Sequence, residues 1–180
     1  EKLAKKYNLL IIEDCAHAVE TLYKGKQAGT FGDFGCFSFY VTKNVVTGEG
    51  GMIITKQEQY ADRLKILALH GMTKDAWKRF GDEGYHHYQV VASGFKYNMT
   101  DMQAALGIHQ LARVNKNWLK REAIWKTYSN RLKHLSLGLP AAARPSDRHA
   151  YHLFPIRIDA SKVGITRDEF LNEMAARRIG

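Results

Sequence analysis

One lysine, Lys43, stands alone between an aromatic run and a glycine-rich segment. Phe37, Phe39 and Tyr40 precede it, and Val45 follows it. An ammonium group that such neighbours withdraw from water has a lowered pKa, because burial disfavours the charged form. A lysine amine in that state is a nucleophile that forms an imine with an aldehyde. The setting of Lys43 therefore predicts covalent chemistry on a carbonyl compound.

A carboxylate that complements this amine, Asp14, comes just after the aliphatic run Leu9–Ile12. An imine needs an electron sink, and an aspartate can hold the protonated nitrogen of a pyridine ring, in the lysine-plus-aspartate pattern of pyridoxal phosphate enzymes. Ser38 offers a hydroxyl to a phosphate oxygen, and the glycines within 48–51 allow a ligand to approach the backbone closely. No Walker motif is present, so the sequence does not indicate nucleotide hydrolysis.

An α/β framework is predicted around these residues. The continuous apolar run 9–12 is typical of a strand buried on both faces, and two further strands are expected at 36–40 and 52–55. Apolar residues recur with helical period over 57–69. This order of elements favours a mostly parallel sheet flanked by helices. Asp14 would then lie at the carboxyl end of a strand, where open α/β sheets bind their ligands.

A long helix is expected in the second half of the chain. Thr100 and Gln103 form a capping-box pattern that opens it, and its apolar positions continue to Leu132. The helix exceeds thirty residues or breaks once. The irregular segment 71–99 before it is long for a connection, so we predict that it serves a function.

Two domains are predicted, a large one over residues 1–135 and the start of a small α/β one over 136–180. The composition of 137–145 is that of a linker. A strand is expected at 151–158, and a second capping box at 166–169 opens a terminal helix.

Composition places the chain among globular proteins. Its 180 residues are 45% apolar and 25% charged, which argues against disorder. The longest apolar runs are far shorter than the about 20 residues of a membrane-spanning helix, and no signal peptide is recognised. We expect a cytoplasmic protein with no membrane partner. Cys15 and Cys36 lack CxxC spacing and a zinc-type histidine partner, so two reduced thiols and no metal site are predicted.

The net charge is +9, from 27 Lys and Arg against 18 Asp and Glu. The positive residues are scattered at helical spacing between apolar positions, which is typical of solvated helix faces. No nucleic-acid partner is therefore expected. A basic module that binds polyanions stays open as an alternative, and it predicts steeply salt-dependent binding.

Four segments, in order, resemble the signatures of the DegT-like family of pyridoxal-phosphate-dependent nucleotide-sugar aminotransferases. A fifth resembles the branch of that family that acts on nucleotide-linked 4-keto sugars. The four are IIEDCAHA (11–18), GDFGCFSFYVTKN (32–44), TGEGGMI (47–53) and GFKYNMTDMQAALG (94–107), and the fifth is HGMTKDAWKRF (70–80). The resemblance covers essentially the whole chain. It implies the large-domain portion of the type I pyridoxal-phosphate transferase fold, followed by the start of a small α/β domain.

The resemblance also implies a reaction and roles for four residues. An amino group, expected to come from glutamate, moves to a keto carbon of a nucleotide-linked sugar with pyridoxal 5'-phosphate as cofactor. Lys43 is implied to be the Schiff-base lysine and proton shuttle, and Asp14 to lie at the pyridine nitrogen. His17 is implied to lie near the phenolic oxygen of the ring, and Ser38 at the phosphate.

A homodimer with shared active sites is a further implication of the resemblance. Asn98 matches a position that, in similar enzymes, reaches the phosphate of the neighbouring subunit's cofactor. Members of the family are considerably longer, so the chain is expected to be part of a larger enzyme. Trp77 and Arg79 are candidate substrate contacts, because a planar ring and a guanidinium suit a nucleotide base and a diphosphate.

Simpler roles remain open for several of these residues. Asp14 could cap a helix that follows it, with His17 as an ordinary side chain of that helix. Ser38 could be satisfied by backbone. For the whole protein the alternatives are another type I enzyme such as a sugar dehydratase, although relatives that dehydrate typically carry histidine in place of the lysine, or an inactive fragment.

Overall fold

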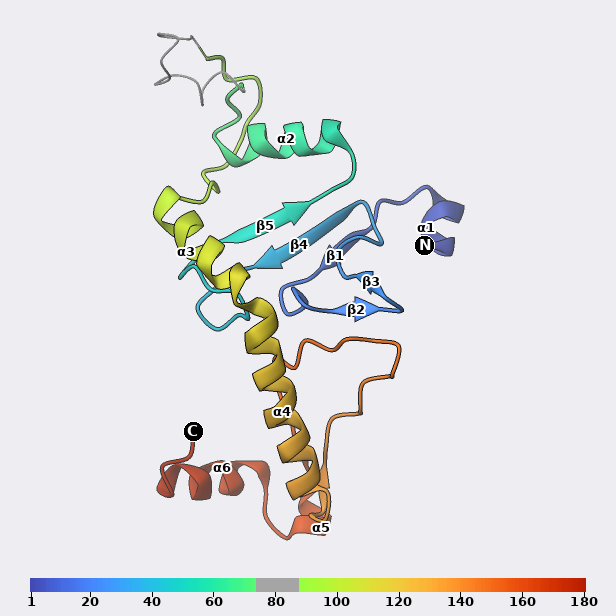
Figure 1. Cartoon of the computed structure of the whole chain (residues 1–180), viewed down its shortest axis with the longest axis vertical. Helices are drawn as coiled ribbons and strands as arrows, with labels where there is room; N and C mark the ends of the chain where they lie inside the picture. The colour runs from blue at the N-terminus through green and yellow to red at the C-terminus, as the bar shows by residue number, and fades with distance from the viewer. Residues whose placement is uncertain (74–87) are drawn as a thin grey trace.

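The computed structural model describes residues 1–73 and 88–180. Figure 1 shows the arrangement of its strands and helices. The strands are β1 (Ile12–Asp14), β2 (Leu22–Tyr23), β3 (Lys26–Gln27), β4 (Phe34–Ser38), β5 (Gly51–Ile54), β6 (Leu137–Gly138) and β7 (Arg157–Ile158). The helices are α1 (Lys2–Tyr7), α2 (Glu58–Ala68), α3 (Asp101–Ala112), α4 (Val114–Leu132), α5 (Ala160–Val163) and α6 (Arg167–Ala176).

A three-stranded sheet in the order β1-β4-β5 positions the segments of interest. β1 runs parallel to β4, with Asp14 opposite Cys36, and β4 runs antiparallel to β5. The α/β class is confirmed, but only one of the two pairings is parallel. A parallel crossover needs about a dozen residues or more and usually a helix. The segment from β4 to β5 is a loop of that minimal length, so the chain turns back antiparallel.

The sequence between β1 and β4 forms turns and a small hairpin. Lys24 (φ 50°) and Gly25 (φ 78°) connect β2 to β3 in the left-handed conformation that two-residue hairpin turns require. The helix considered after Asp14 is absent. Instead the Ala18 N–H donates to Cys15 O at 3.0 Å, and the Thr21 N–H donates to Ala18 O at 3.0 Å.

The prediction of a fully buried strand over 9–12 is wrong. The strand begins only at Ile12, a residue that is 68% exposed, and Leu9 and Leu10 are exposed too. Within the described residues β1 is an edge strand. A continuous apolar run predicts a strand that is buried on both faces. Burial also requires other helices or strands to pack against those faces, and the described residues do not provide them here.

The long helix breaks once, at Arg113, into α3 and α4, which run end to end along the molecule (Figure 1). Both predicted capping boxes are present: the Thr100 hydroxyl accepts the Gln103 N–H, and the Thr166 hydroxyl accepts the Glu169 N–H. None of the helices in the described ranges has the length and apolar composition that a membrane crossing needs.

The strand predicted at 151–158 forms only over Arg157–Ile158, which pairs with β6 at the start of the predicted linker. The residues before it pack against α4 instead. Trp125 is buried there, with its ring centroid 4.7 Å from that of Phe154 and 5.2 Å from that of Tyr151. Aromatic contacts with a helix have replaced the ladder hydrogen bonds of a longer strand.

Candidate active site

The loop between β4 and β5 carries Lys43 and is fixed by its own packing. The Phe39 N–H donates to Gly50 O, and the Thr47 N–H donates to Phe39 O, both at 2.9 Å. Two residues of the loop, Val45 and Thr47, are buried. Gly50 has φ 150°, and a Cβ there would lie 2.5 Å from Thr47 Oγ1, so only glycine fits. Gly50 is therefore required for the conformation of the loop.

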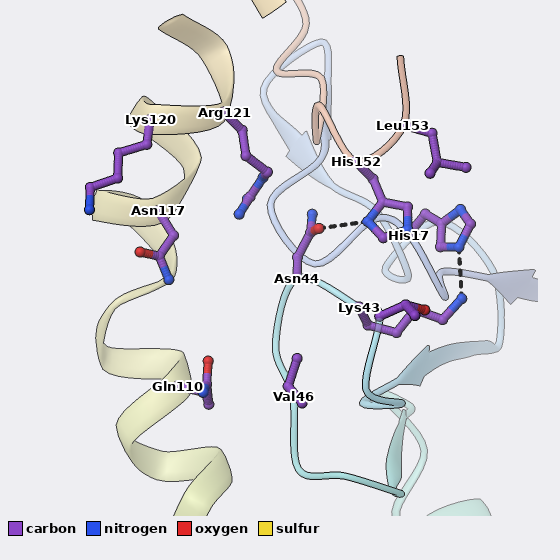
Figure 2. Close-up of a pocket in the computed structure, with 11 residues that line it drawn as sticks. His17, Lys43, Asn44, Val46, Gln110, Asn117, Lys120, Arg121, His152 and Leu153 are labelled. Carbon is purple, nitrogen blue, oxygen red and sulfur yellow. Dashed lines mark hydrogen bonds between the residues drawn. The ribbon is translucent and has the colours of Figure 1, made fainter. Parts of the chain in front are cut away.

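The amine of Lys43 meets His17 at the edge of the sheet. Lys43 Nζ lies 2.7 Å from His17 Nε2, and Figure 2 shows the two side chains pointing toward each other. His17 belongs to the turn after β1, and Lys43 to the loop after β4. Because β1 and β4 are parallel, both segments leave the sheet at the same edge.

The apolar enclosure predicted for Lys43 is not what the structure contains. Lys43 is half-buried, and the neighbouring Tyr40 and Val41 are exposed. The contact that distinguishes this amine is the one with His17. A neutral imidazole nitrogen accepts a hydrogen bond from an ammonium group, so His17 is placed to orient the amine.

A hollow of about 750 Å³ opens between this loop and the helices α3 and α4. Figure 2 shows polar side chains on both sides of it. The loop side contributes Lys43, Asn44 and Val46 together with His17 and His152, and the helix side contributes Gln110, Asn117, Lys120 and Arg121. Three of these side chains are Lys or Arg and none is a carboxylate. The hollow therefore suits a polar, anionic ligand.

Beneath the hollow, the carboxylate of Glu20 is buried, with its side chain 1% exposed. Arg121 forms an ion pair with one carboxylate oxygen. Asn44 Nδ2 donates to the other at 2.9 Å, and His152 Nδ1 lies 2.7 Å from Asn44 Oδ1. Arg121 Nε also donates to Ala150 O at 3.2 Å. One buried acid thus ties the Lys43 loop, α4 and the 150–152 segment together.

His152 connects this group of side chains to His17. The two ring centroids are 4.0 Å apart, with an angle of 35° between the planes. Burial lowers the pKa of His152, and the nearby His17, Lys43 and Arg121 lower it further, whereas Glu20 opposes them. The imidazole of His152 is therefore biased toward its neutral form.

Asp14 and Ser38 lie at the carboxyl ends of β1 and β4, the edge that also carries His17 and Lys43. Neither is among the residues that line the hollow. Asp14 Oδ1 accepts the Ala16 N–H at 3.0 Å, and Ser38 Oγ accepts the Tyr40 N–H at 3.4 Å. Each side chain retains further acceptor capacity for a ligand.

Asn98 does not line the hollow, and its side chain is hydrogen-bonded to neighbouring residues. Lys96 Nζ donates to its side-chain oxygen, and its side-chain amide donates to Met99 O at 3.4 Å. The substrate candidates Trp77 and Arg79 fall outside the described residues. The structure thus brings together His17 and Lys43, with Asp14 and Ser38 on the same edge.

The side chains at this edge of the sheet fit pyridoxal phosphate. The cofactor requires an accessible primary amine, a group against its ring, an acid for the ring nitrogen and hydroxyl or amide donors for its phosphate. Lys43, His17, Asp14 and Ser38 are of these types in that order. The volume of the hollow also lies within the roughly 300–1,000 Å³ of small-molecule sites.

The two cysteines are free, as predicted. Cys15 is 2% exposed, and burial together with the charges of Glu13 and Asp14 raises the pKa of its thiol to about 11. Burial and Asp14 also raise the pKa of Cys36. Both thiols are thus biased toward the unreactive protonated form.

Four polar residues of the site were not anticipated from the sequence. They are Glu20, Asn44, Arg121 and His152. Glu20 and Arg121 are 101 residues apart in the chain, and Asn44 and His152 are 108 apart. The sequence contains little indication of them. Glu20 follows AHAV and Arg121 lies in a polar helical segment, and acids and arginines in such positions are mostly surface residues.

Comparison with known proteins gives a consistent result. The sequence model of the DegT/DnrJ/EryC1/StrS aminotransferase family matches residues 1–180. The spore coat polysaccharide biosynthesis protein SpsC of Bacillus subtilis is 42% identical over 172 residues, which are 96% of this chain and 44% of that protein. The chain thus spans less than half the length of the curated relatives that it matches.

Solved structures share the fold of the chain at lower sequence identity. Helicobacter pylori PseC, an aminotransferase involved in the biosynthesis of pseudoaminic acid, superposes with a TM-score of 0.85 at 26% identity, over 98% of this chain and 45% of that one. The Streptococcus pneumoniae protein Spr1654, solved in a PLP form, gives 0.81 at 30% identity, over 98% and 44%. The type I fold expected from the sequence is confirmed by these superpositions.

Proposed function

Because this chain belongs to the DegT/DnrJ/EryC1/StrS aminotransferase family, we propose that the protein transfers an amino group to a keto sugar linked to a nucleotide. Pyridoxal phosphate is the proposed cofactor and glutamate the proposed donor. The observation that carries the proposal is the 2.7 Å contact between Lys43 Nζ and His17 Nε2 at the carboxyl edge of the sheet, on the wall of a cationic hollow.

The proposed binding residues are Lys43, Asp14, His17 and Ser38, with Asn98 contributed by a second subunit. When bound, pyridoxal phosphate supplies an electron sink for the charge left when a proton leaves carbon. Lys43 Nζ, as a free amine, would take up the proton from the α carbon of the donor and later return it. His17 would orient that amine, and Asp14 would keep a proton on the nitrogen that it contacts.

Lys120 supports an anionic substrate, because a cationic side chain across the hollow from Lys43 suits a phosphate group. Trp77 and Arg79 are retained as proposed contacts to the nucleotide. A homodimer in the cytoplasm, and a division of the chain at residues 135 and 136, also belong to this proposal.

Replacing Lys43 tests the assignment. In the complete protein, Lys43→Ala should lower the rate of amino transfer by about 10²–10⁴-fold or more, because it removes the general base. It should also abolish the visible absorbance that pyridoxal phosphate acquires when a lysine binds it. Lys65→Ala is the control, since Lys65 pairs only with the surface residue Asp62 among the contacts described for it. Retained absorbance and turnover in Lys43→Ala would refute the proposal.

The product of the reaction gives an independent check. Incubation with glutamate and a nucleotide-linked keto sugar should yield 2-oxoglutarate and an amino sugar in equal amounts. Loss of water from the sugar without consumption of glutamate would instead indicate a dehydratase.

A further inference from the structure

Glu20 is the most deeply buried acid among the described residues, and nothing in the proposed chemistry uses it directly. A buried carboxylate is retained only where hydrogen bonds and an opposite charge compensate its lost hydration. Glu20 has both, from Asn44 and Arg121. What these two partners touch next therefore indicates what the buried acid does.

The orientation of Asn44 is set by Glu20. A carboxylate only accepts hydrogen bonds, so the side-chain NH₂ of Asn44 must face Glu20, and it does so at 2.9 Å. The amide oxygen of Asn44 is then directed at His152 Nδ1, 2.7 Å away. An amide oxygen only accepts, so the hydrogen of this bond must belong to His152 Nδ1.

The tautomer of His152 follows from that bond. With its proton on Nδ1, neutral His152 keeps Nε2 as the unprotonated nitrogen. The ring of His152 lies against that of His17, with centroids 4.0 Å apart, and His17 Nε2 contacts Lys43 Nζ. Figure 2 shows these side chains following one another from Asn44 to Lys43 on one side of the hollow.

We propose that Glu20 is a positioning residue, which acts through Asn44 to fix the Nδ1–H tautomer of His152 and through the His152–His17 contact to hold the amine of Lys43 at the hollow. Arg121 balances the charge of Glu20 and joins α4 to the same unit. The inference rests on the proposed function only for its effect on turnover. The tautomer and the charge coupling are properties of the protein without cofactor.

The first test is the ¹⁵N NMR spectrum of His152 in the complete, cofactor-free protein labelled on histidine, with the signal assigned by its loss in His152→Asn. The unchanged protein should show the Nδ1–H pattern. Asn44→Leu removes the acceptor but leaves the Glu20–Arg121 pair, so it should lose that pattern. The Nε2–H pattern in the unchanged protein, or an unaltered spectrum in Asn44→Leu, would overturn the proposal.

The second test uses the sign of a titration shift. The charged and titratable groups that act on His152 are Glu20, Arg121, His17 and Lys43. Glu20→Gln should lower the pKa of His152 further, because it removes the one acid that raises this pKa among the described residues. Arg121→Gln should raise the pKa, because it removes a positive one. Opposite signs would show that both members of the Glu20–Arg121 pair act on His152 through their charge, and shifts in the same direction would contradict the coupling.

The double variant Glu20→Gln/Arg121→Gln keeps the test decisive if Glu20→Gln fails to fold. It leaves two amides that can hydrogen-bond to each other, and the pKa of His152 should return toward its original value. If the pKa of His152 in the double variant stays far below its value in the unchanged protein, the proposal is overturned. Glu122→Gln is the matched control, since Glu122 pairs with Lys126 within α4 and is not among the groups that shift the pKa of His152, so it should not move that pKa.

Turnover supplies the link to the proposed function. Asn44→Leu should lower kcat by about tenfold or more, while KM changes little. A change of that size corresponds to the loss of one hydrogen bond to a charged or polar partner. If Lys43→Ala keeps full activity, the aminotransferase proposal fails, yet the NMR tests still decide whether Glu20 controls His152. If the NMR shifts occur but kcat in Asn44→Leu is unchanged, the positioning of Lys43 by this group of residues is refuted.

Discussion

Lys43 and His17 are distinguished from other lysines and histidines of the chain by what surrounds them. Lys43 is carried by a loop that the buried residues Val45 and Thr47 anchor, and His17 follows the buried Cys15 in a hydrogen-bonded turn. The contact between them therefore joins two segments with little freedom to move. Preorganisation of this kind is what a proton-transfer group needs, because little conformational entropy is lost when it acts.

Asp14 offers a prediction at the same site. Asp14→Asn keeps an oxygen that can accept the Ala16 N–H, so the turn should survive, but it removes the charge. We expect pyridoxal phosphate still to bind, while the rate of proton removal from the donor falls by about 10²-fold or more. Single-turnover absorbance measurements would report both quantities.

Asp33→Asn is the matched control for that experiment. Asp33 also accepts a backbone N–H, that of Ile11 at 2.8 Å, but it lies at the opposite end of the sheet strands from the site. Its replacement should leave the rate unchanged. An equal rate in Asp14→Asn and the unchanged protein would remove the role given to Asp14.

Helix α4 does more than connect two parts of the chain. It carries Asn117 and Arg121 to the hollow, and it carries Trp125 to the segment that contains Ala150 and His152. Trp118 strengthens the same junction, since its Nε1–H donates to His149 O at 2.7 Å and its ring lies under the Arg148 guanidinium. One face of this helix thus holds the 148–154 segment in place for the site.

Trp125→Ala tests that role. Removing a buried tryptophan should lower the free energy of unfolding by about 3–5 kcal/mol, and it should weaken cofactor binding because the 148–154 segment loosens. Denaturant unfolding and absorbance titration would measure the two effects. Leu119→Ala, on the exposed side of α4, should cost no more than about 0.5 kcal/mol. Equal losses in the two variants would contradict the proposed junction.

The whole chain exposes far more surface than a compact protein of its size. Its accessible surface is 13,468 Å² for a mass of 20.5 kDa, against about 8,900 Å² from the scaling of folded monomers. Large apolar side chains are exposed on β1 at Ile12 and on α3 at Met102 and Ile108. Exposed apolar surface of this extent is typical of surfaces that pack against other polypeptide.

Shared active sites can be tested with mixed dimers. If Asn98 acts in the site of the neighbouring subunit, a heterodimer of one Lys43→Ala and one Asn98→Ala subunit contains one intact site. It should recover about half of the activity of the unchanged dimer, although each homodimeric variant is impaired. Differently tagged subunits, co-expressed and purified in tandem, would provide the sample.

A heterodimer of Lys43→Ala and Asp14→Asn subunits separates the two arrangements, since both of those residues belong to a subunit's own site. There, one site lacks Lys43 and the other lacks the Asp14 charge, so activity should stay low. Failure of the Lys43→Ala/Asn98→Ala heterodimer to exceed it would show that Asn98 does not act across subunits.

Local features of this protein were determined by the sequence alone. The helix over 57–69 and both capping boxes depend on residues within one or two turns of each other, so periodicity and spacing suffice to predict them. The motifs around Lys43 and Asp14 likewise identified the family, because a motif is defined by residue types and their order in the sequence.

Only the tertiary structure decided which distant groups meet. The contact of Lys43 with His17, the burial of Glu20 against Arg121 and the pairing of Asn44 with His152 join residues that are 26 to 108 positions apart. The antiparallel return of β5 and the exposure of β1 were equally hidden. Each depends on the path of the backbone and on which surfaces pack against each other. Burial is a tertiary property, so the residue type alone does not distinguish a buried acid from a solvated one.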